Sequence, residues 1–278
     1  MENIIGIDMG GTTIQGGLIE GKSLIRQFAA DTNAQAGGET TLNVLKGVIS
    51  KLKNTKTKAI GIGVPSVVDK NKGIVYNVQN IKDWEEVHLK DLLESEFNIP
   101  VFIDNDANCF AYGEKIFGKG RDFRNFVGIT LGTGVGGGII QNNHLLLDSN
   151  CGSGEFGEIP YLDSILEDYC GSSFFVRNAN MTGYEAAIKA KQGDLEAIRI
   201  YEEYGLHLSM LVKIILLIID PEAIIFGGSI AKSFDLFEKS MYENLTDFPY
   251  PNSVDKIQIL TSDLHEIGVL GAGALCIQ

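Results

Sequence analysis

The feature that most constrains the fold is a strand, glycine turn and strand pattern that occurs once in each half of the chain. Residues 4–19 read as an apolar strand, a turn rich in glycine and a second strand, and residues 126–141 read the same way. An alignment of the two segments without a gap makes three glycine pairs coincide: Gly6/Gly128, Gly10/Gly132 and Gly16/Gly138. The repetition predicts two similar lobes, each offering one glycine turn to a shared cleft.

The other segments alternate strand and helix patterns, which is typical of α/β proteins. The expected strands are 23–28, 59–64, 101–103 and 223–226, and the expected helices are 40–52, 87–97, 106–117, 195–219 and 268–276. With 278 residues, the chain is long enough for two compact domains. We therefore predict an α/β fold with two lobes.

Charge and cysteine content exclude several classes of function. The net charge is −13 and there is no basic run, whereas proteins that bind nucleic acids use Lys and Arg on the phosphates. The most apolar segment, 211–219, is about half as long as a membrane span. The four cysteines, Cys109, Cys151, Cys170 and Cys276, lack zinc-site spacing, and no leader sequence is recognisable. We expect a cytoplasmic protein with reduced thiols and without nucleic-acid or membrane partners.

Two glycine patterns match nucleotide-binding motifs only formally. Residues 16–23 fit GxxxxGK[ST], but strand-like residues surround them and Glu20 would place a carboxylate in the anion site. Residues 132–137 fit GxGxxG, but a strand follows them where a dinucleotide-binding fold requires a helix. We expect a hairpin turn at 20–21, and a P-loop NTPase that uses Lys22 remains the rival interpretation.

A third glycine turn has the chemistry to bind phosphate. Gly10 and Gly11 follow a strand directly and allow the backbone amides to approach phosphate oxygens, and Thr12 and Thr13 add hydroxyl donors. Asp8, at the end of the strand, can hold Mg²⁺ through water or phosphate. The second copy offers the same groups at Gly132, Thr133 and Gly134. An ordinary hairpin is the alternative for either turn taken alone.

The order of these motifs resembles the ROK family of sugar kinases, within the actin–hexokinase–Hsp70 superfamily. The resemblance extends nearly from end to end, and five blocks carry it: 8–12, 102–114 (FIDNDANCFAYGE), 128–138 (GITLGTGVGGG), 154–157 (GEFG) and 221–230 (PEAIIFGGSI). It implies two lobes of ribonuclease-H-like fold with a cleft between them. Residues 1–113 plus 266–278 would form the small lobe, with the first phosphate turn and the catalytic group. Residues 114–265 would form the large lobe, with the second phosphate turn, the adenosine site and a homodimer interface.

The resemblance also implies an activity, which is the transfer of phosphate from ATP, with Mg²⁺, to a hydroxyl group on C6 of a hexose or hexose derivative. Asp106 would be the catalytic base that accepts the hydroxyl proton, and a helix cap is the alternative role for this residue. Asn105 would bind the sugar. Gly227 and Gly228 would let the backbone pass beside adenosine, where a plain strand-to-helix turn is the alternative.

Four further residues match sugar contacts of the family, and the alternative for each carboxylate is a solvated surface group. They are Asn80, Glu155, Glu158 and Glu167. Glu158 occupies a position where the family has His, so the resemblance does not identify the sugar. Many members carry a zinc-binding loop of His and Cys in this region, whereas residues 159–166 contain no cysteine. We therefore expect no zinc and a pocket shaped by a short acidic turn of Asp163, Glu167 and Asp168.

Other assignments remain open at this point. A non-catalytic sugar sensor of the same fold is possible, and polyphosphate is a conceivable phosphate donor. The family also includes repressors with an N-terminal DNA-binding extension, but this chain starts at the first phosphate strand, and we expect no such extension. The histidines match no catalytic position and are expected in the core or on the surface. Trp84 fits the sugar site or the core equally well.

Overall fold

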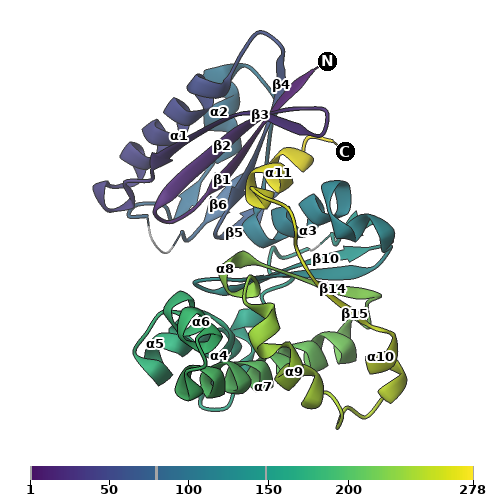
Figure 1. The fold of residues 1–278 in the computed structure, drawn as a ribbon. Helices are drawn as coiled ribbons and strands as arrows, with labels where there is room; N and C mark the ends of the chain where they lie inside the picture. The colour runs from purple at the N-terminus through teal and green to yellow at the C-terminus, as the bar shows by residue number, and fades with distance from the viewer. Residues whose placement is uncertain (1, 79–80, 148, 278) are drawn as a thin grey trace. The chain divides into compact units, whose positions relative to one another are not determined.

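The computed structural model describes residues 2–78, 81–147 and 149–277, which form two compact units (Figure 1). The first unit contains Met1–Arg121, His144–Ser153 and Asp263–Gln278, and the second contains Asp122–Asn143 and Gly154–Ser262. The boundaries of these units therefore differ from the expected boundaries between the lobes, which were 113/114 and 265/266. A boundary after residue 113 would cut helix α3 (Asp106–Phe117), which instead stays whole within the first unit.

The first unit is built on a mixed sheet of five strands in the order β3-β2-β1-β4-β8. The first three strands along the chain are antiparallel neighbours, and β4 and β8 are parallel to β1. Their bounds are β1 (Asn3–Met9), β2 (Thr13–Glu20), β3 (Ser23–Asp31), β4 (Thr57–Val64) and β8 (Val101–Asn105). The carboxyl ends of β1, β4 and β8 therefore meet at one edge of the sheet, where α/β proteins place their ligands.

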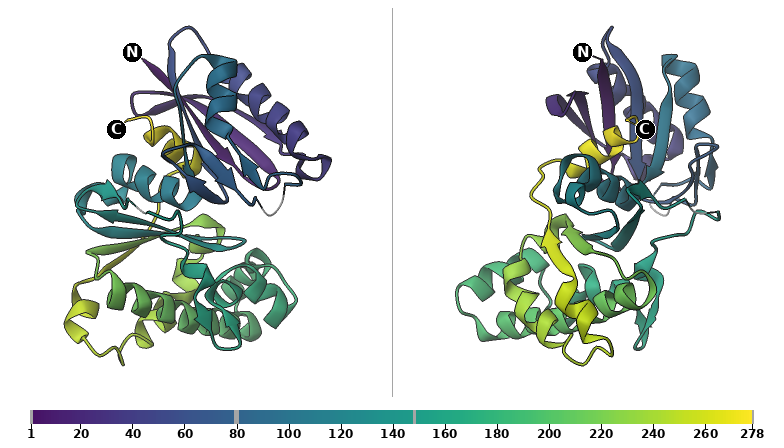
Figure 2. Two further views of the ribbon diagram at one scale, coloured as in Figure 1. Left: turned by 180° about the vertical axis from the view of Figure 1, so that it is seen from behind. Right: turned by 90° about the vertical axis from the view of Figure 1, so that its right-hand side faces the viewer.

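Helices cover both faces of this sheet, as the two views in Figure 2 show. Gly16 faces Leu52 and Val48 of α1 (Gly38–Leu52), while Gly17 faces Val269 of α11 (Ile267–Ala274), because neighbouring strand residues point to opposite faces. The other elements of this unit are η1 (Ala34–Ala36), β5 (Val67–Asp69), β6 (Ile74–Tyr76), β7 (Glu86–Val87), α2 (Leu89–Phe97) and β11 (His144–Leu145). A short 3-10 turn, η2 (Lys119–Asp122), follows α3.

Helix α11 lies unusually close to the sheet because two strand residues there lack a side chain. A Cβ atom at Gly6 would lie 2.0 Å from the carbonyl oxygen of Val269, and one at Gly61 would lie 1.9 Å from that of Ala272. Any larger residue would push the helix away. The two glycines thus explain how the closing helix of the chain packs on the N-terminal strands, a contact far apart in sequence.

The second unit repeats this topology. Four of its strands lie side by side in the order β10-β9-β14-β15, which matches β2-β1-β4-β8. Strands β9 and β10 are antiparallel, and β14 is parallel to both β9 and β15. The strands are β9 (Phe126–Leu131), β10 (Val135–Gln141), β14 (Ala223–Gly227) and β15 (Gln258–Thr261). The predicted α/β fold of two similar halves is confirmed.

The remaining elements of the second unit are mostly helical. They are η3 (Phe156–Glu158), β12 (Pro160–Tyr161), β13 (Ser164–Ile165), α4 (Leu166–Cys170), α5 (Ser173–Ala179), α6 (Gly183–Lys191), α7 (Leu195–Ile218), α8 (Gly228–Ala231), α9 (Phe234–Glu243) and α10 (Pro251–Lys256). The segment 211–219 was predicted to be part of a buried helix. Its residues up to Ile218 belong to α7, but Leu217 and Ile218 are exposed, so the predicted burial holds only in part. Among the described residues, no helix combines the length and the apolar character needed to cross a bilayer.

The strand pairing corrects one detail of the predicted repeat. Gly6 pairs with Gly17, whereas Gly128 pairs with Gly138, so the partner of Gly138 in the repeat is Gly17 and not Gly16. The cause is a turn that is one residue longer in the first copy. There the amide of Gly10 donates to the carbonyl of Thr13, three residues on, whereas the amide of Gly132 donates to that of Gly134, two residues on.

Both formal nucleotide-binding patterns prove to be strand hairpins. Glu20 ends β2, Gly21 makes the turn with a φ of 62°, and Ser23 begins β3. This confirms the predicted hairpin and contradicts a P-loop at Lys22. The GxGxxG segment enters β10, not a helix, as predicted.

Candidate functional site

The carboxyl edge of the first sheet gathers acidic side chains. Asp8 on β1 is in register with Gly63 on β4, and Gly63 is in register with Asp104 on β8. The three residues therefore project to the same face of the sheet. Gly63 has no side chain, and the Cys109 thiol fills the space that this leaves, with its Sγ 3.1 Å from the place that a Cβ of residue 63 would occupy. Burial, together with the negative charges of Asp104, Asp106 and Asp8, raises the pKa of Cys109 well above its ordinary value.

Asp106 is the first residue of α3, as predicted, and Asn105 caps the helix. The Asn105 Oδ1 atom accepts hydrogen bonds from the amides of Ala107 at 2.8 Å and Asn108 at 3.3 Å, and its Nδ2 donates to the carbonyl of Ser66 at 3.3 Å. Because Asn105 fills the capping position, helix capping does not explain why an aspartate stands at position 106. Its Oδ1 accepts from the amide of Ala107, 2.8 Å away, and this contact orients the half-buried carboxylate at the positive end of the helix.

A second carboxylate supports this turn from within the sheet. Asp104 is 5% exposed, and its Oδ1 accepts 2.8 Å hydrogen bonds from the Asn105 amide and from Asn108 Nδ2. Neither Asp104 nor Asn108 was selected from the sequence as a functional residue. The signal was present, because both lie in block 102–114, Asp104 two residues before Asp106 and Asn108 two residues after it.

The first glycine turn is held in place by the end of β3. Thr32 donates from its hydroxyl to the Gly10 carbonyl at 2.8 Å and from its amide to the Thr12 carbonyl at 2.9 Å. Thr32 is fully buried, whereas Thr12 is exposed at the tip. Sequence reasoning missed Thr32, which is 22 residues from Gly10 along the chain.

Asp8 stands next to this turn in a setting that opposes its charge. Burial, and to a lesser extent the neighbouring charge of Glu266, raises the pKa of Asp8 to about 6. No group of three or more His, Cys, Asp or Glu able to hold a metal occurs among the described residues. Mg²⁺ commonly binds through one or two carboxylates plus substrate phosphates, so a single carboxylate at Asp8 fits an ion that arrives with a nucleotide.

The second glycine turn is braced by Glu167. The Glu167 Oε2 atom accepts a 2.9 Å hydrogen bond from the amide of Val135, and a Cβ at Gly134 would lie 2.3 Å from the same oxygen. The amide of Ser172 donates to the carbonyl of Gly132 at 2.9 Å. A residue predicted to contact sugar thus directly touches the turn predicted to bind phosphate.

Gly228 brings the backbone of β14 and α8 against the same turn. Its φ is 87°, and a Cβ there would lie 2.2 Å from the carbonyl oxygen of Leu131, the last residue of β9. The preceding residue, Gly227, caps α8 with extended backbone. Glycine is therefore required at 228 for both its conformation and its space.

The three predicted glutamates of the second unit lie in neighbouring elements, and two of them affect the third. Glu155 precedes η3, Glu158 ends it, and Glu167 lies on α4, which packs against η3. The side chain of Glu155 is exposed, yet the surrounding protein and the negative charges of Glu158 and Glu167 raise its pKa. Such a set of acceptors suits hydroxyl groups of a sugar.

Of the two other residues considered for the sugar site, one is not described and the other is not part of this arrangement. Asn80 lies outside the described residues. Trp84 is 4% exposed and packs against Gly38, so it belongs to the core. The acidic turn also differs from expectation, because Asp163 and Asp168 accept hydrogen bonds from Tyr169 and Ser164 and are used within the turn itself.

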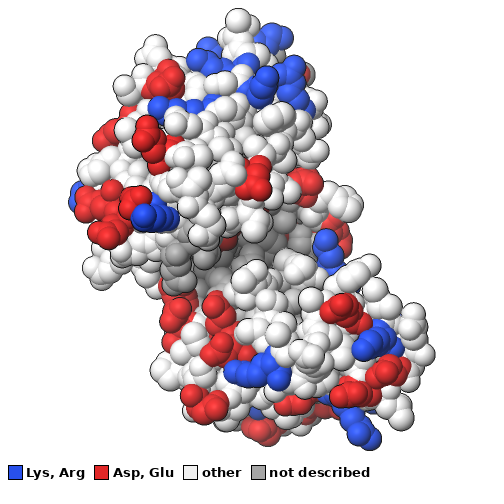
Figure 3. Space-filling view, turned by 90° about the vertical axis from the view of Figure 1, so that its left-hand side faces the viewer, with Lys and Arg blue, Asp and Glu red and all other residues white. Residues whose placement is uncertain are grey.

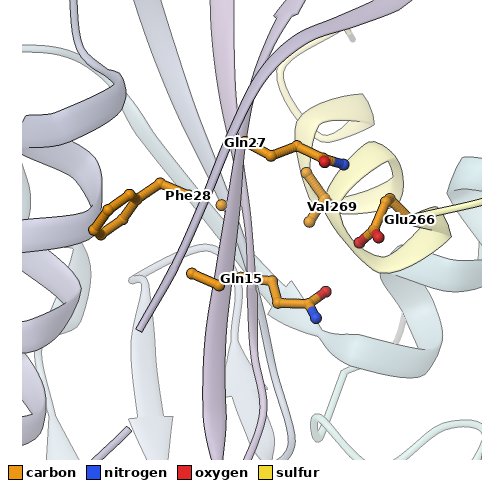
Figure 4. A pocket seen from close by; sticks show the side chains of 7 residues that line it. Gln15, Gln27, Phe28, Glu266 and Val269 are labelled. Carbon is orange, nitrogen blue, oxygen red and sulfur yellow. The ribbon is translucent and has the colours of Figure 1, made fainter. Parts of the chain in front are cut away.

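A shallow cavity of about 180 Å³ lies elsewhere on the first unit (Figure 4). Gln15, Gln27 and Glu266 point toward it over a floor that includes Val269. None of its lining residues is a predicted site residue. The face drawn in Figure 3 carries basic side chains gathered at the top of the view and a mixture of acidic and basic side chains at the bottom.

Comparison with known proteins gives a consistent result. A model of the ROK family matches residues 4–278. Glucokinase of Thermotoga maritima is 30% identical, with 98% of this chain and 96% of the relative covered. The xylose repressor of Bacillus spizizenii is 27% identical, with 99% of this chain and 77% of the relative covered. A ROK family glucokinase from Streptomyces griseus, solved with glucose and AMPPNP, is 27% identical with a TM-score of 0.86, and 98% of each chain is covered.

Proposed function

This chain belongs to the ROK family, and from that premise we propose that it is an ATP-dependent kinase that phosphorylates a hydroxyl group of a hexose or hexose derivative, on C6. The observation that carries the proposal is the placement of Asp106. It is a half-buried carboxylate at the start of α3, oriented by the Ala107 amide, and Asp104 and Asn105 fix the turn before it.

In the proposed reaction, Asp106 accepts the proton of the sugar hydroxyl while that oxygen attacks the γ-phosphorus of ATP. The bond from phosphorus to the β,γ-bridging oxygen breaks, ADP leaves, and the proton stays on the Asp106 carboxylate until solvent removes it. General base catalysis of this kind contributes about 10²- to 10⁴-fold to the rate. Most of the remaining acceleration comes from positioning and charge stabilisation.

The glycine turns are the proposed phosphate sites. Thr12 and Thr13 offer hydroxyl donors in the first turn, and Thr133 does so in the second. The hydrogen bonds of Thr32 and Glu167 hold these turns in place. The backbone amides of the turns are therefore oriented before ATP binds. Gly227 and Gly228 are the proposed adenosine contacts. Mg²⁺, when bound through Asp8 and the nucleotide, would neutralise phosphate charge.

The sugar hydroxyls are proposed to bind Glu155, Glu158 and Glu167, with Asn105 and Asn80. The role of Asn105 in sugar binding is restricted, because its side-chain amide already makes hydrogen bonds to the start of α3 and to Ser66. The proposed homodimer and the cytoplasmic location stay predictions, and sedimentation of the purified chain would measure the oligomeric state.

The xylose repressor among the relatives makes a non-catalytic sugar-binding protein the second candidate. The experiment that separates the two measures ADP release by the purified chain with ATP and Mg²⁺ over a panel of about twenty sugars, with mass spectrometry of the sugar product. We expect phosphorylation of at least one hexose at a rate well above the sugar-free ATPase rate. Sugar binding by calorimetry without phosphorylation, with ATP or with polyphosphate as donor, would overturn the kinase assignment and support the sensor.

A further inference from the structure

The segment between Glu158 and Glu167 forms a small hairpin that depends on contacts outside itself. Strands β12 and β13 have two residues each and are joined at Leu162 and Asp163, with Leu162 in the left-handed conformation at a φ of 52°. Helix α4, which carries Glu167, has only five residues. Hairpins and single helical turns of this length do not form by themselves.

An aromatic cluster, defined here as Tyr161, Tyr169, Phe174 and His207, supplies those contacts. Tyr161, on the hairpin, contacts Nδ1 of His207 through its hydroxyl at 3.1 Å, and His207 projects from the long helix α7. The Tyr169 ring, on α4, lies 5.1 Å from the Tyr161 ring and 4.8 Å from the His207 ring. Phe174 completes the cluster at 5.6 Å from His207.

Further bonds tie α4 to the same surroundings. The Tyr204 hydroxyl, also on α7, donates to the Cys170 carbonyl at 2.7 Å. Arg177 stacks over the Tyr169 ring at 4.6 Å and donates to the Asp168 carbonyl at 2.9 Å. Residues of α4 itself are therefore anchored on α7 and α5, and Glu167 reaches from this anchored helical turn to the Val135 amide.

The surroundings of His207 favour the neutral imidazole, which the hydrogen bond with Tyr161 requires. It is 6% exposed, and burial is the largest effect on its pKa, which is lowered despite the opposing influence of Glu203, 3.8 Å from its Nε2. The neighbouring charge of Arg177 lowers the pKa further. A neutral imidazole can accept a hydrogen bond from the Tyr161 hydroxyl at Nδ1, which a ring protonated on both nitrogens cannot do.

We propose that Tyr161 and His207 are positioning residues for sugar binding, because they lock the hairpin and α4 so that Glu158 and Glu167 face the substrate while Glu167 holds the second glycine turn. This inference rests on the proposed function. It assigns the control of sugar affinity to the aromatic cluster around His207, although neither Tyr161 nor His207 is placed at the reacting atoms.

The test uses Tyr161→Phe, which removes one hydroxyl and keeps the ring. Its matched control is Tyr201→Phe, because Tyr201 lies on α7 itself and its hydroxyl donates to the Gly183 carbonyl at 2.7 Å, away from α4. We expect Tyr161→Phe to raise the sugar KM by about five- to tenfold, with the ATP KM changed less than about twofold. Tyr201→Phe should leave both constants within about twofold while lowering thermal stability to a similar degree.

A double-mutant cycle gives the second readout. Adding Tyr161→Phe to His207→Phe should cost nothing further if the two act through one hydrogen bond. His207→Gln, which keeps an acceptor oxygen, should recover part of the sugar affinity that His207→Phe loses. Equal effects of Tyr161→Phe and Tyr201→Phe on the sugar KM, or full additivity in the cycle, would overturn the proposal.

Failure of the proposed function has a separate signature. If the wild-type chain phosphorylates no sugar, the same variants are compared by calorimetric sugar Kd in the absence of ATP. A weaker Kd for Tyr161→Phe but not for Tyr201→Phe then supports the positioning role even though the kinase assignment has failed. Unchanged Kd values contradict the positioning role.

Discussion

The carboxylate of Asp8 lies directly against Gly268 in the first turn of α11, where a Cβ atom would be 2.2 Å from Asp8 Oδ2. The chain thus forces a carboxylate into a confined place at the end of β1. The raised pKa of about 6 is the consequence, because burial penalises the charged form. A carboxylate at this position therefore costs stability, as is common for residues placed for function.

Asp8→Asn should therefore stabilise the protein, and more so at pH 7 than at pH 4.5. The unfolded state titrates near 3.8 and the folded state near about 6, so the folded state binds more protons between these values. The free energy of unfolding of the wild type then falls as pH rises through this window. We expect the advantage of the variant to grow by about 2 kcal/mol between the two pH values, measured by urea unfolding. An advantage that is the same at both would contradict the raised pKa.

Gly228→Ala should be much more damaging than Gly193→Ala. Both glycines have nearly the same backbone, with φ of 87° and 88°, but nothing lies within 4 Å of a Cβ at 193, whereas one at 228 meets the Leu131 backbone. We expect a loss of about 1–2 kcal/mol at 193 from the backbone conformation alone. At 228 we expect a larger loss and an ATP KM raised at least about tenfold. Unfolding curves and steady-state kinetics of both variants check this, and equal behaviour would exclude the close approach.

Lys22→Ala should leave activity within about twofold of the wild type. Lys22 lies in the turn between β2 and β3, where no helix follows to bind phosphate. The measurement is kcat and ATP KM under saturating sugar. Loss of ATP turnover would revive the P-loop interpretation and contradict the assignment of phosphate binding to the two other turns.

Elements that local chemistry determines were predictable from the sequence. Helix α3 begins at Asp106 and ends at Phe117 as predicted, because Asn105 is a strong cap and the apolar spacing continues to the end. Strand β9 likewise begins at the predicted residue, Phe126. The family resemblance supplied the candidate base. The glycine turns were selected for their own chemistry and for their repetition, because local propensity does not distinguish them from hairpins.

What the sequence did not predict depends on contacts between distant residues. The hairpin of β12 and β13 is too short for a periodic signal, and Tyr161 meets His207 across 46 residues of chain. Thr32 could not be linked to Gly10 without the pairing of β2 and β3. The glycine alignment was off by one because an alignment without a gap cannot detect a turn of different length.

Asp106→Asn is the most direct test of the kinase account, because the side-chain oxygen of Asn can still accept the Ala107 amide while the base is lost. Asp91→Asn, on the exposed face of α2, is the matched control. With the best sugar substrate, the account predicts that ADP release by the Asp106 variant falls at least about 100-fold with sugar Kd nearly unchanged. Turnover within about tenfold of the wild type would contradict it.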